Sequence, residues 1–90
     1  MTDIIRKLCE CYGPSGSEGA VRDIIRRELE ASGVLKRKGC QAEVDPLGNL
    51  VVLLKGTGGG RRVMLAAHMD EIGIVVSHVD AKGFLRFSNI

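Results

Sequence analysis

The residues best suited to chemistry are His68 and Asp70, which stand two apart at the end of an apolar run. On an extended backbone, side chains at i and i+2 project from the same face, so the imidazole and the carboxylate are expected to lie together. An imidazole nitrogen can bind a metal ion, and a carboxylate can hydrogen-bond near the ring and hold it in place. Glu71, the next residue, is expected to point away from both.

A simpler explanation of the pair stays open at this point. A His-x-Asp triplet often arises by chance, and a lone histidine is usually structural or exposed. Catalytic zinc takes about three protein ligands plus water, so one histidine and one carboxylate cannot complete such a site. His78 is the only other histidine, and we interpret it as structural because it lies on a later predicted strand.

Two further motifs are poor candidates for chemistry. The glycine-rich stretch 56–60 lacks the Gly-Lys-Ser/Thr and the following helix of a phosphate-binding loop, so we interpret it as a flexible connection. The three cysteines are an odd number in a chain without a signal peptide, which argues against a disulfide framework. We expect Cys9, Cys11 and Cys40 to be reduced and structural.

The first element that must position the pair is a helix in the first twelve residues. Its apolar residues recur at helical spacing: Ile4, Ile5, Leu8 and Tyr12. Thr2 or Asp3 is the expected N-cap. Gly13-Pro14 should end the helix, because the residue before a proline is pushed out of the helical region.

A second helix is expected to follow. Ser15 and Glu18 have the spacing of a capping box, in which each side chain binds the other residue's backbone N–H. The apolar stripe comprises Val21, Ile24, Ile25 and Leu29, with charged residues opposite. Gly33 is the expected residue just past the C-terminal end.

From Gln41 the pattern changes to strands. Ala42 and Val44 alternate with acidic residues, the stretch 45–49 reads as a turn, and an apolar strand follows at 50–54, which together predict a β-hairpin. Residues 63–67 are short, apolar and unalternating, as expected for a strand buried on both faces. Residues 72–79, a turn at 80–83 and a return strand from 84 complete the pattern. This order of elements indicates an α/β domain.

Composition narrows the classes of function. The net charge is only +2 and basic residues are interleaved with acidic ones, so we expect no nucleic-acid partner. No apolar run reaches the ~20 residues of a membrane span, and residues 1–12 lack the pattern of a signal peptide. We therefore expect a cytoplasmic protein with no membrane association.

Four segments, in order along the chain, carry a family resemblance. The octet from Ala66 to Gly73, Ala-Ala-His-Met-Asp-Glu-Ile-Gly, resembles the signature of the glutamyl-aminopeptidase-like metallopeptidases. These include the tetrahedral aminopeptidases and proteins often labelled endoglucanase or cellulase. The stretches 13–18, 45–50 and 80–87 resemble that family's N-terminal turn, its Asp-x-Leu-Gly-Asn-Leu hairpin and the segment leading into its second domain.

The resemblance implies an aminopeptidase with two divalent metal ions, zinc or cobalt, per subunit. His68 matches the first metal-ligand histidine, and Asp70 matches the catalytic-site aspartate that supports it. The implied mechanism is hydrolysis by metal-activated water, with a glutamate as general base. The bridging aspartate, the Glu-Glu pair and the remaining ligands have no counterpart here, so we expect the 90-residue chain alone to be inactive.

The resemblance also implies a domain plan. Residues 1–73 would be the N-terminal part of a zinc-peptidase-like α/β catalytic domain, and 74–90 would begin an inserted β-rich dimerisation domain. Peptides would be the substrates, and the protein would form homo-oligomers.

Two other hypotheses stay open. The chain could be a truncated, non-catalytic product that acts only as an assembly or binding module, since exposed sheet edges and an unfinished core favour self-association. A glycoside hydrolase is suggested only by labels of related proteins. Such an enzyme needs two carboxylates flanking a sugar, and the adjacent Asp70 and Glu71 would face opposite ways on a strand.

Overall fold

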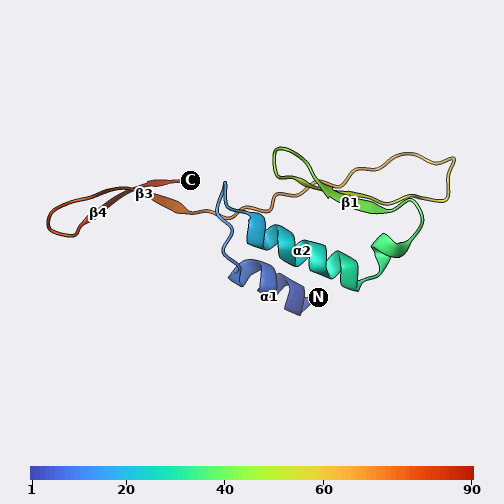
Figure 1. Cartoon of the computed structure of the whole chain (residues 1–90), viewed down its shortest axis with the longest axis horizontal. Helices are drawn as coiled ribbons and strands as arrows, with labels where there is room; N and C mark the ends of the chain where they lie inside the picture. The colour runs from blue at the N-terminus through green and yellow to red at the C-terminus, as the bar shows by residue number, and fades with distance from the viewer.

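A computed structural model describes all residues 1–90 and shows a mixed α/β arrangement of two helices and two separate antiparallel sheets (Figure 1). The elements in chain order are α1 (Thr2–Glu10), α2 (Gly19–Ala31), the short 3-10 helix η1 (Val34–Lys36), β1 (Gln41–Val44), β2 (Leu50–Leu53), β3 (Ile74–Val79) and β4 (Leu85–Asn89). The helices form where the apolar spacing of 3.6 predicts them. Neither helix is long and apolar enough to cross a membrane.

The helix α1 begins one residue earlier than expected. Met1 is its N-cap and makes no side-chain capping bond, so the predicted cap at Thr2 or Asp3 is wrong. Asp3 lies inside the first turn, where it forms an ion pair 3.1 Å long with Lys7 one turn later. The predicted end of the helix before Gly13-Pro14 is confirmed, since α1 ends at Glu10.

The predicted capping box at the start of α2 is also wrong. The N-cap is Glu18, and no side chain caps the helix. The Glu18 carboxylate instead accepts a bond of 2.8 Å from the backbone N–H of Gly16, inside the loop. Ser15 is turned toward Asp70, a long-range partner that no local pattern could reveal. The far end of α2 follows the prediction, because Gly33 adopts the left-handed conformation with φ of 73°.

The loop between the two helices lies at the best-packed point of the molecule. α1 and α2 lie side by side (Figure 1), and an ion pair of 2.9 Å between Lys7 and Glu28 joins them. Gly13, Pro14 and Val21, the last at 5% exposure, are the three buried residues of the chain. The small core therefore sits where the loop meets the start of α2.

The β1–β2 hairpin confirms the predicted one. The strands pair antiparallel, with Gln41 opposite Leu53 and Val44 opposite Leu50. The turn is organised by Asp45, whose carboxylate accepts from the backbone N–H groups of Leu47 and Asn49 and from the side-chain amide of Asn49. These three bonds explain why the short polar stretch reverses the chain.

The predicted buried strand at 63–67 is contradicted. These residues belong to no strand, and the side chains of Val63, Met64 and Leu65 are 83%, 88% and 94% exposed. A strand buried on both faces needs a hydrogen-bonded neighbour and a covering layer on each side. The 90 residues place neither beside this segment, so it runs as an extended chain.

The second hairpin, β3–β4, extends from one end of the molecule (Figure 1), which measures 65 × 26 × 18 Å. The predicted strand, turn and return strand are confirmed at 74–79, 80–83 and 85–89. Two backbone bonds between Gly73 and Ile90 close the base of the hairpin. The register shifts between Val76 and His78, which marks a bulge-like irregularity.

Candidate functional site

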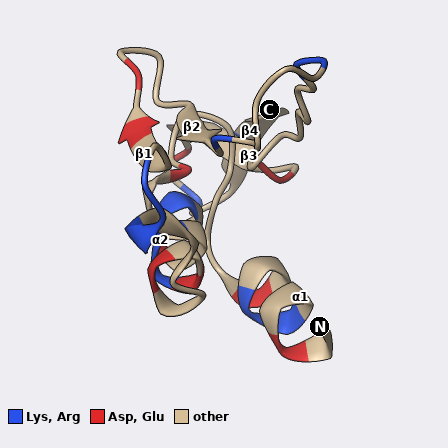
Figure 2. Ribbon diagram, turned by 90° about the vertical axis from the view of Figure 1, so that its right-hand side faces the viewer, with Lys and Arg blue, Asp and Glu red and all other residues tan.

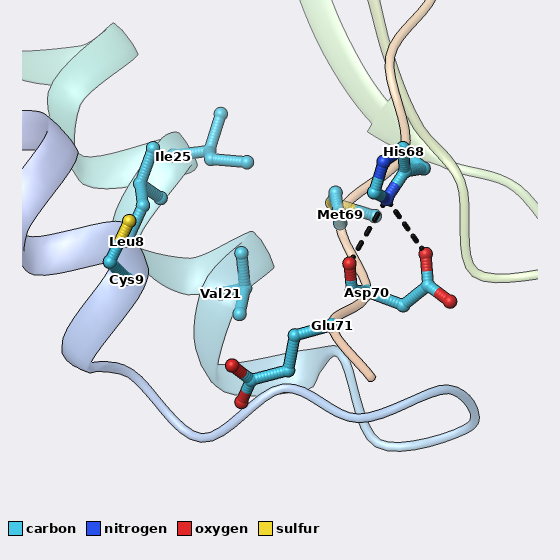
Figure 3. Close-up of a pocket in the computed structure, with 8 residues that line it drawn as sticks. All are labelled: Leu8, Cys9, Val21, Ile25, His68, Met69, Asp70 and Glu71. Carbon is cyan, nitrogen blue, oxygen red and sulfur yellow. Dashed lines mark hydrogen bonds and ion pairs between the residues drawn. The ribbon is translucent and has the colours of Figure 1, made fainter. Parts of the chain in front are cut away.

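The predicted pair is brought together in the structure. The Nδ1 atom of His68 lies 3.0 Å from Oδ1 of Asp70 and 3.0 Å from the backbone carbonyl oxygen of the same residue (Figure 3). The extended backbone at 67–70 places both side chains on one face, as the spacing of two requires.

These two contacts determine which ring nitrogen of His68 carries a proton. A carbonyl oxygen only accepts hydrogen bonds, and so does an ionised carboxylate. The Nδ1 atom must therefore be the donor, which leaves the lone pair of Nε2 free in the neutral ring. Because the His68 side chain is 86% exposed, that lone pair is available to a ligand.

Asp70 is held by a second partner on its other oxygen. The hydroxyl of Ser15 donates to Oδ2, while Oδ1 faces the imidazole of His68. The Ser15 hydrogen bond is the main reason that the pKa of Asp70 lies below its ordinary value, and the hydrogen bond with His68 lowers it further. Asp70 is therefore ionised at neutral pH, which keeps it an acceptor toward the ring.

Glu71 points away from the pair, as predicted, and anchors the helix–helix loop. Its carboxylate accepts a bond of 3.2 Å from the backbone N–H of Gly13, on the side of the helices in Figure 3. Its own N–H donates to the carbonyl of Gly13 at 2.9 Å, and Pro14 and Glu71 form an isolated parallel bridge. This pairing fixes Ser15 next to Asp70.

The pair borders an open cavity of about 290 Å³ between the helices and the extended chain. The lining side chains, drawn in Figure 3, are Leu8, Cys9, Val21, Ile25, His68, Met69, Asp70 and Glu71. One wall is apolar and comes from α1 and α2, while the other carries the imidazole and the carboxylates. Across this cavity the apolar side chains of the two helices therefore face the polar groups of the extended chain.

The chain does not gather a complete metal site. No group of three or more His, Cys, Asp or Glu side chains is placed to hold a metal ion. His78 lies in the β3–β4 hairpin, and Cys9, Cys11 and Cys40 are free thiols. The donor set fits one ligand of a metal site, His68, with the carboxylate partner that metal-binding histidines usually have.

Comparison with known proteins points to one family. The family model described as M42 glutamyl aminopeptidase matches residues 48–90, which contain the pair. A provisionally assigned aminopeptidase of Acetivibrio thermocellus is 42% identical over 92 residues, covering 100% of this chain and 25% of that protein. The lysyl aminopeptidase of Pyrococcus furiosus and the glutamyl aminopeptidase of Lactococcus lactis are each 36% identical over 93% of this chain and 22% of theirs. Residues 48–90 therefore match the M42 glutamyl aminopeptidase family, and the chain as a whole is similar to about a quarter of the length of curated aminopeptidases.

These matches confirm the resemblance drawn from the sequence motifs. The chain spans 22–25% of the length of these curated relatives. The Ser15 loop lies outside the stretch matched by the family model but within the full-length match to the Acetivibrio thermocellus protein. No solved structure matches the chain.

Two residues of the candidate site were not singled out by their chemistry in the sequence. Ser15 has the spacing of a helix cap, and only the fold shows that its hydroxyl meets Asp70, 55 positions away. The sequence predicts only that Gly13 helps to end the first helix, whereas in the structure its N–H and its carbonyl both hydrogen-bond to Glu71. The resemblance at 13–18 is the one sequence signal that marks this loop for more than helix capping.

Proposed function

We propose that this chain is part of a metal-dependent aminopeptidase that removes residues from the N-terminus of peptides. The observation that carries the proposal is the hydrogen bond between His68 and Asp70, with Nδ1 bound at 3.0 Å and the ring exposed. The match to the M42 family supports the reaction class, because the similar proteins are named aminopeptidases.

In this proposal His68 holds one of two divalent metal ions, zinc or cobalt, through Nε2, and Asp70 keeps the ring in the tautomer that binding needs. When bound, such ions supply an activated water and polarise the scissile carbonyl. The residues of this chain fit one corner of that site only, so we derive no reaction step from them. The remaining ligands and the general base would lie outside these 90 residues, and the chain alone would be inactive.

The wider expectations belong to the same proposal. Residues 1–73 would form the first part of the catalytic domain, and 74–90 the start of an inserted β-rich domain. Peptides with a free α-amino group would be the substrates. A homo-oligomer in the cytoplasm, without nucleic-acid or membrane partners, would be the working form.

A peptidase assay on the intact gene product tests the proposal, after its mass has been compared with the 9.7 kDa of this chain. The substrates are one peptide with a free N-terminus and the same peptide N-acetylated. We expect cleavage of the free peptide only, loss of activity with a chelator, and recovery on addition of Zn²⁺ or Co²⁺.

Matched histidine variants make the test specific to the site. Replacing His68 by Ala should lower kcat/KM by at least about 100-fold, since the loss of a residue that merely supports a metal ligand costs roughly 10- to 100-fold. Replacing His78, an exposed histidine in β3, by Ala should leave kcat/KM unchanged. Activity that resists the chelator, or that survives in His68→Ala, would show the proposal to be wrong. Hydrolysis of cellulose or oligosaccharides instead of peptides would favour a glycosidase.

A further inference from the structure

The side chain–side chain hydrogen bond that joins the most distant positions of the chain runs from the hydroxyl of Ser15 to Oδ2 of Asp70. It occupies the one carboxylate oxygen that the imidazole of His68 leaves free. A hydroxyl, a carboxylate and an imidazole are thus linked in a row, and the row ends at the exposed Nε2 side of the ring.

Burial and backbone hydrogen bonds hold the loop segment that precedes Ser15 in place. The buried residues Gly13 and Pro14 precede it, and Gly13 exchanges two bonds with Glu71, of 2.9 and 3.2 Å. Glu71 is the direct neighbour of Asp70 in the chain. The two residues of the hydroxyl–carboxylate bond, Ser15 and Asp70, therefore lie close to the backbone pairing between Gly13 and Glu71.

A carboxylate held at one oxygen only can still swing about its side-chain bonds. Asp70 has 38% of its side chain exposed, so packing alone does not lock it. A second bond at Oδ2 sets the plane of the carboxylate and aims Oδ1 at the ring nitrogen of His68. The same bond thereby favours the tautomer with its proton on Nδ1.

We propose that Ser15 is a positioning residue of this site, which acts through Asp70 to orient His68 for metal binding. The effect on metal affinity rests on the function proposed above, whereas the effect on the ring tautomer does not. The serine contacts neither the metal-binding nitrogen nor a substrate, and the proposal gives it no direct part in the chemistry.

The test uses the intact gene product stripped of metal, with Co²⁺ as the probe. Ser15→Ala removes the hydroxyl, Ser15→Thr retains it, and Ser17→Ala is a control in the same loop, because the Ser17 side chain makes no hydrogen bond. Two properties are measured, the Co²⁺ dissociation constant and the ¹⁵N NMR signals of the His68 ring without metal.

We expect Ser15→Ala to weaken Co²⁺ binding about 3- to 10-fold, less than the roughly 10- to 100-fold typical of losing the group that contacts the ligand itself. The fraction of His68 with its proton on Nδ1 should fall in the same variant. Ser15→Thr should restore both properties, and Ser17→Ala should leave both unchanged. In an Asp70→Ala background, Ser15→Ala should have no further effect, because its route to the ring is gone.

Three results would overturn the inference: unchanged values in Ser15→Ala, no rescue by Ser15→Thr, or an equal loss with and without Asp70. A general folding role for the loop produces the last two. If the intact protein cleaves no peptide but the His68 tautomer still responds to Ser15→Ala, the proposed function fails and the positioning role stands. If the intact protein cleaves peptides in a chelator-sensitive way but the His68 tautomer does not respond to Ser15→Ala, the positioning role fails and the proposed function stands.

Discussion

Replacing Gly13 by Ala should weaken the contact between the helix–helix loop and the extended segment that carries His68, Asp70 and Glu71. A Cβ at this position would overlap Cγ2 of Val21, closer than real Cβ atoms come to a neighbour. Val21 cannot easily turn aside, because it is a buried, β-branched residue in α2 and has essentially one rotamer there. Gly13 has no positive φ, so the cost of the substitution is the overlap itself.

The magnitude follows from three contributions. Overpacking a tight contact costs about 1–3 kcal/mol, and each loosened bond between Gly13 and Glu71 adds about 0.5–1.5 kcal/mol. Alanine also lowers the conformational entropy of the unfolded chain, which offsets about 0.4–1 kcal/mol of this cost. If one of the two bonds loosens, the last two contributions nearly cancel, so we expect the paired unit of Gly13 and Glu71 to lose about 1–3 kcal/mol in its free energy of opening.

Amide hydrogen exchange of the intact gene product measures this directly, because the N–H of Glu71 donates to the carbonyl of Gly13. Exchange at Glu71 should become about 5- to 150-fold faster in Gly13→Ala, at 1.4 kcal/mol per tenfold. The control is Gly19→Ala at the start of α2, where a Cβ would lie 3.8 Å from the end of the Arg22 side chain. That variant should be neutral or more stable. Equal exchange at Glu71 in both variants would refute the steric argument.

Three further predictions concern charge and packing. The pKa of Asp45 is lowered, chiefly by the hydrogen bond from the side-chain amide of Asn49. The turn is therefore fully stabilised above the ordinary carboxylate pKa, and it weakens as the pH falls through the lowered pKa of Asp45. Replacing Asn49 by Ala should raise the pKa of Asp45 measured by NMR titration. The pKa of Lys7 is raised, first by its bond to Glu28, so this contact persists below the ordinary lysine value and is lost as pH rises through the raised one. Glu28→Gln should lower the titrated pKa of Lys7, with little change in stability because both groups are exposed. The 90-residue chain expressed alone should self-associate in size-exclusion chromatography, since only three of its residues, Gly13, Pro14 and Val21, are buried, and a compact monomer would contradict this.

The sequence alone predicted the local elements well. Both helices and both hairpins lie where apolar periodicity and turn residues place them, because these signals act between residues a few positions apart. Gly33 at the end of α2 and Asp45 in the first turn are examples, since a left-handed glycine and an aspartate-centred turn are local chemistry. The proximity of His68 to Asp70 belongs to the same class, because alternation along an extended backbone is enough to predict it.

The tertiary structure decided what depended on distant partners. Ser15 and Glu18 matched a capping box, but the hydroxyl of Ser15 found an ionised carboxylate 55 residues away, a stronger partner than a backbone N–H. The apolar run 63–67 matched a buried strand, but it stays extended because no neighbouring strand lies beside it in these 90 residues. Local energies determine which element a segment can form, whereas the partners available in space determine which bonds its side chains make.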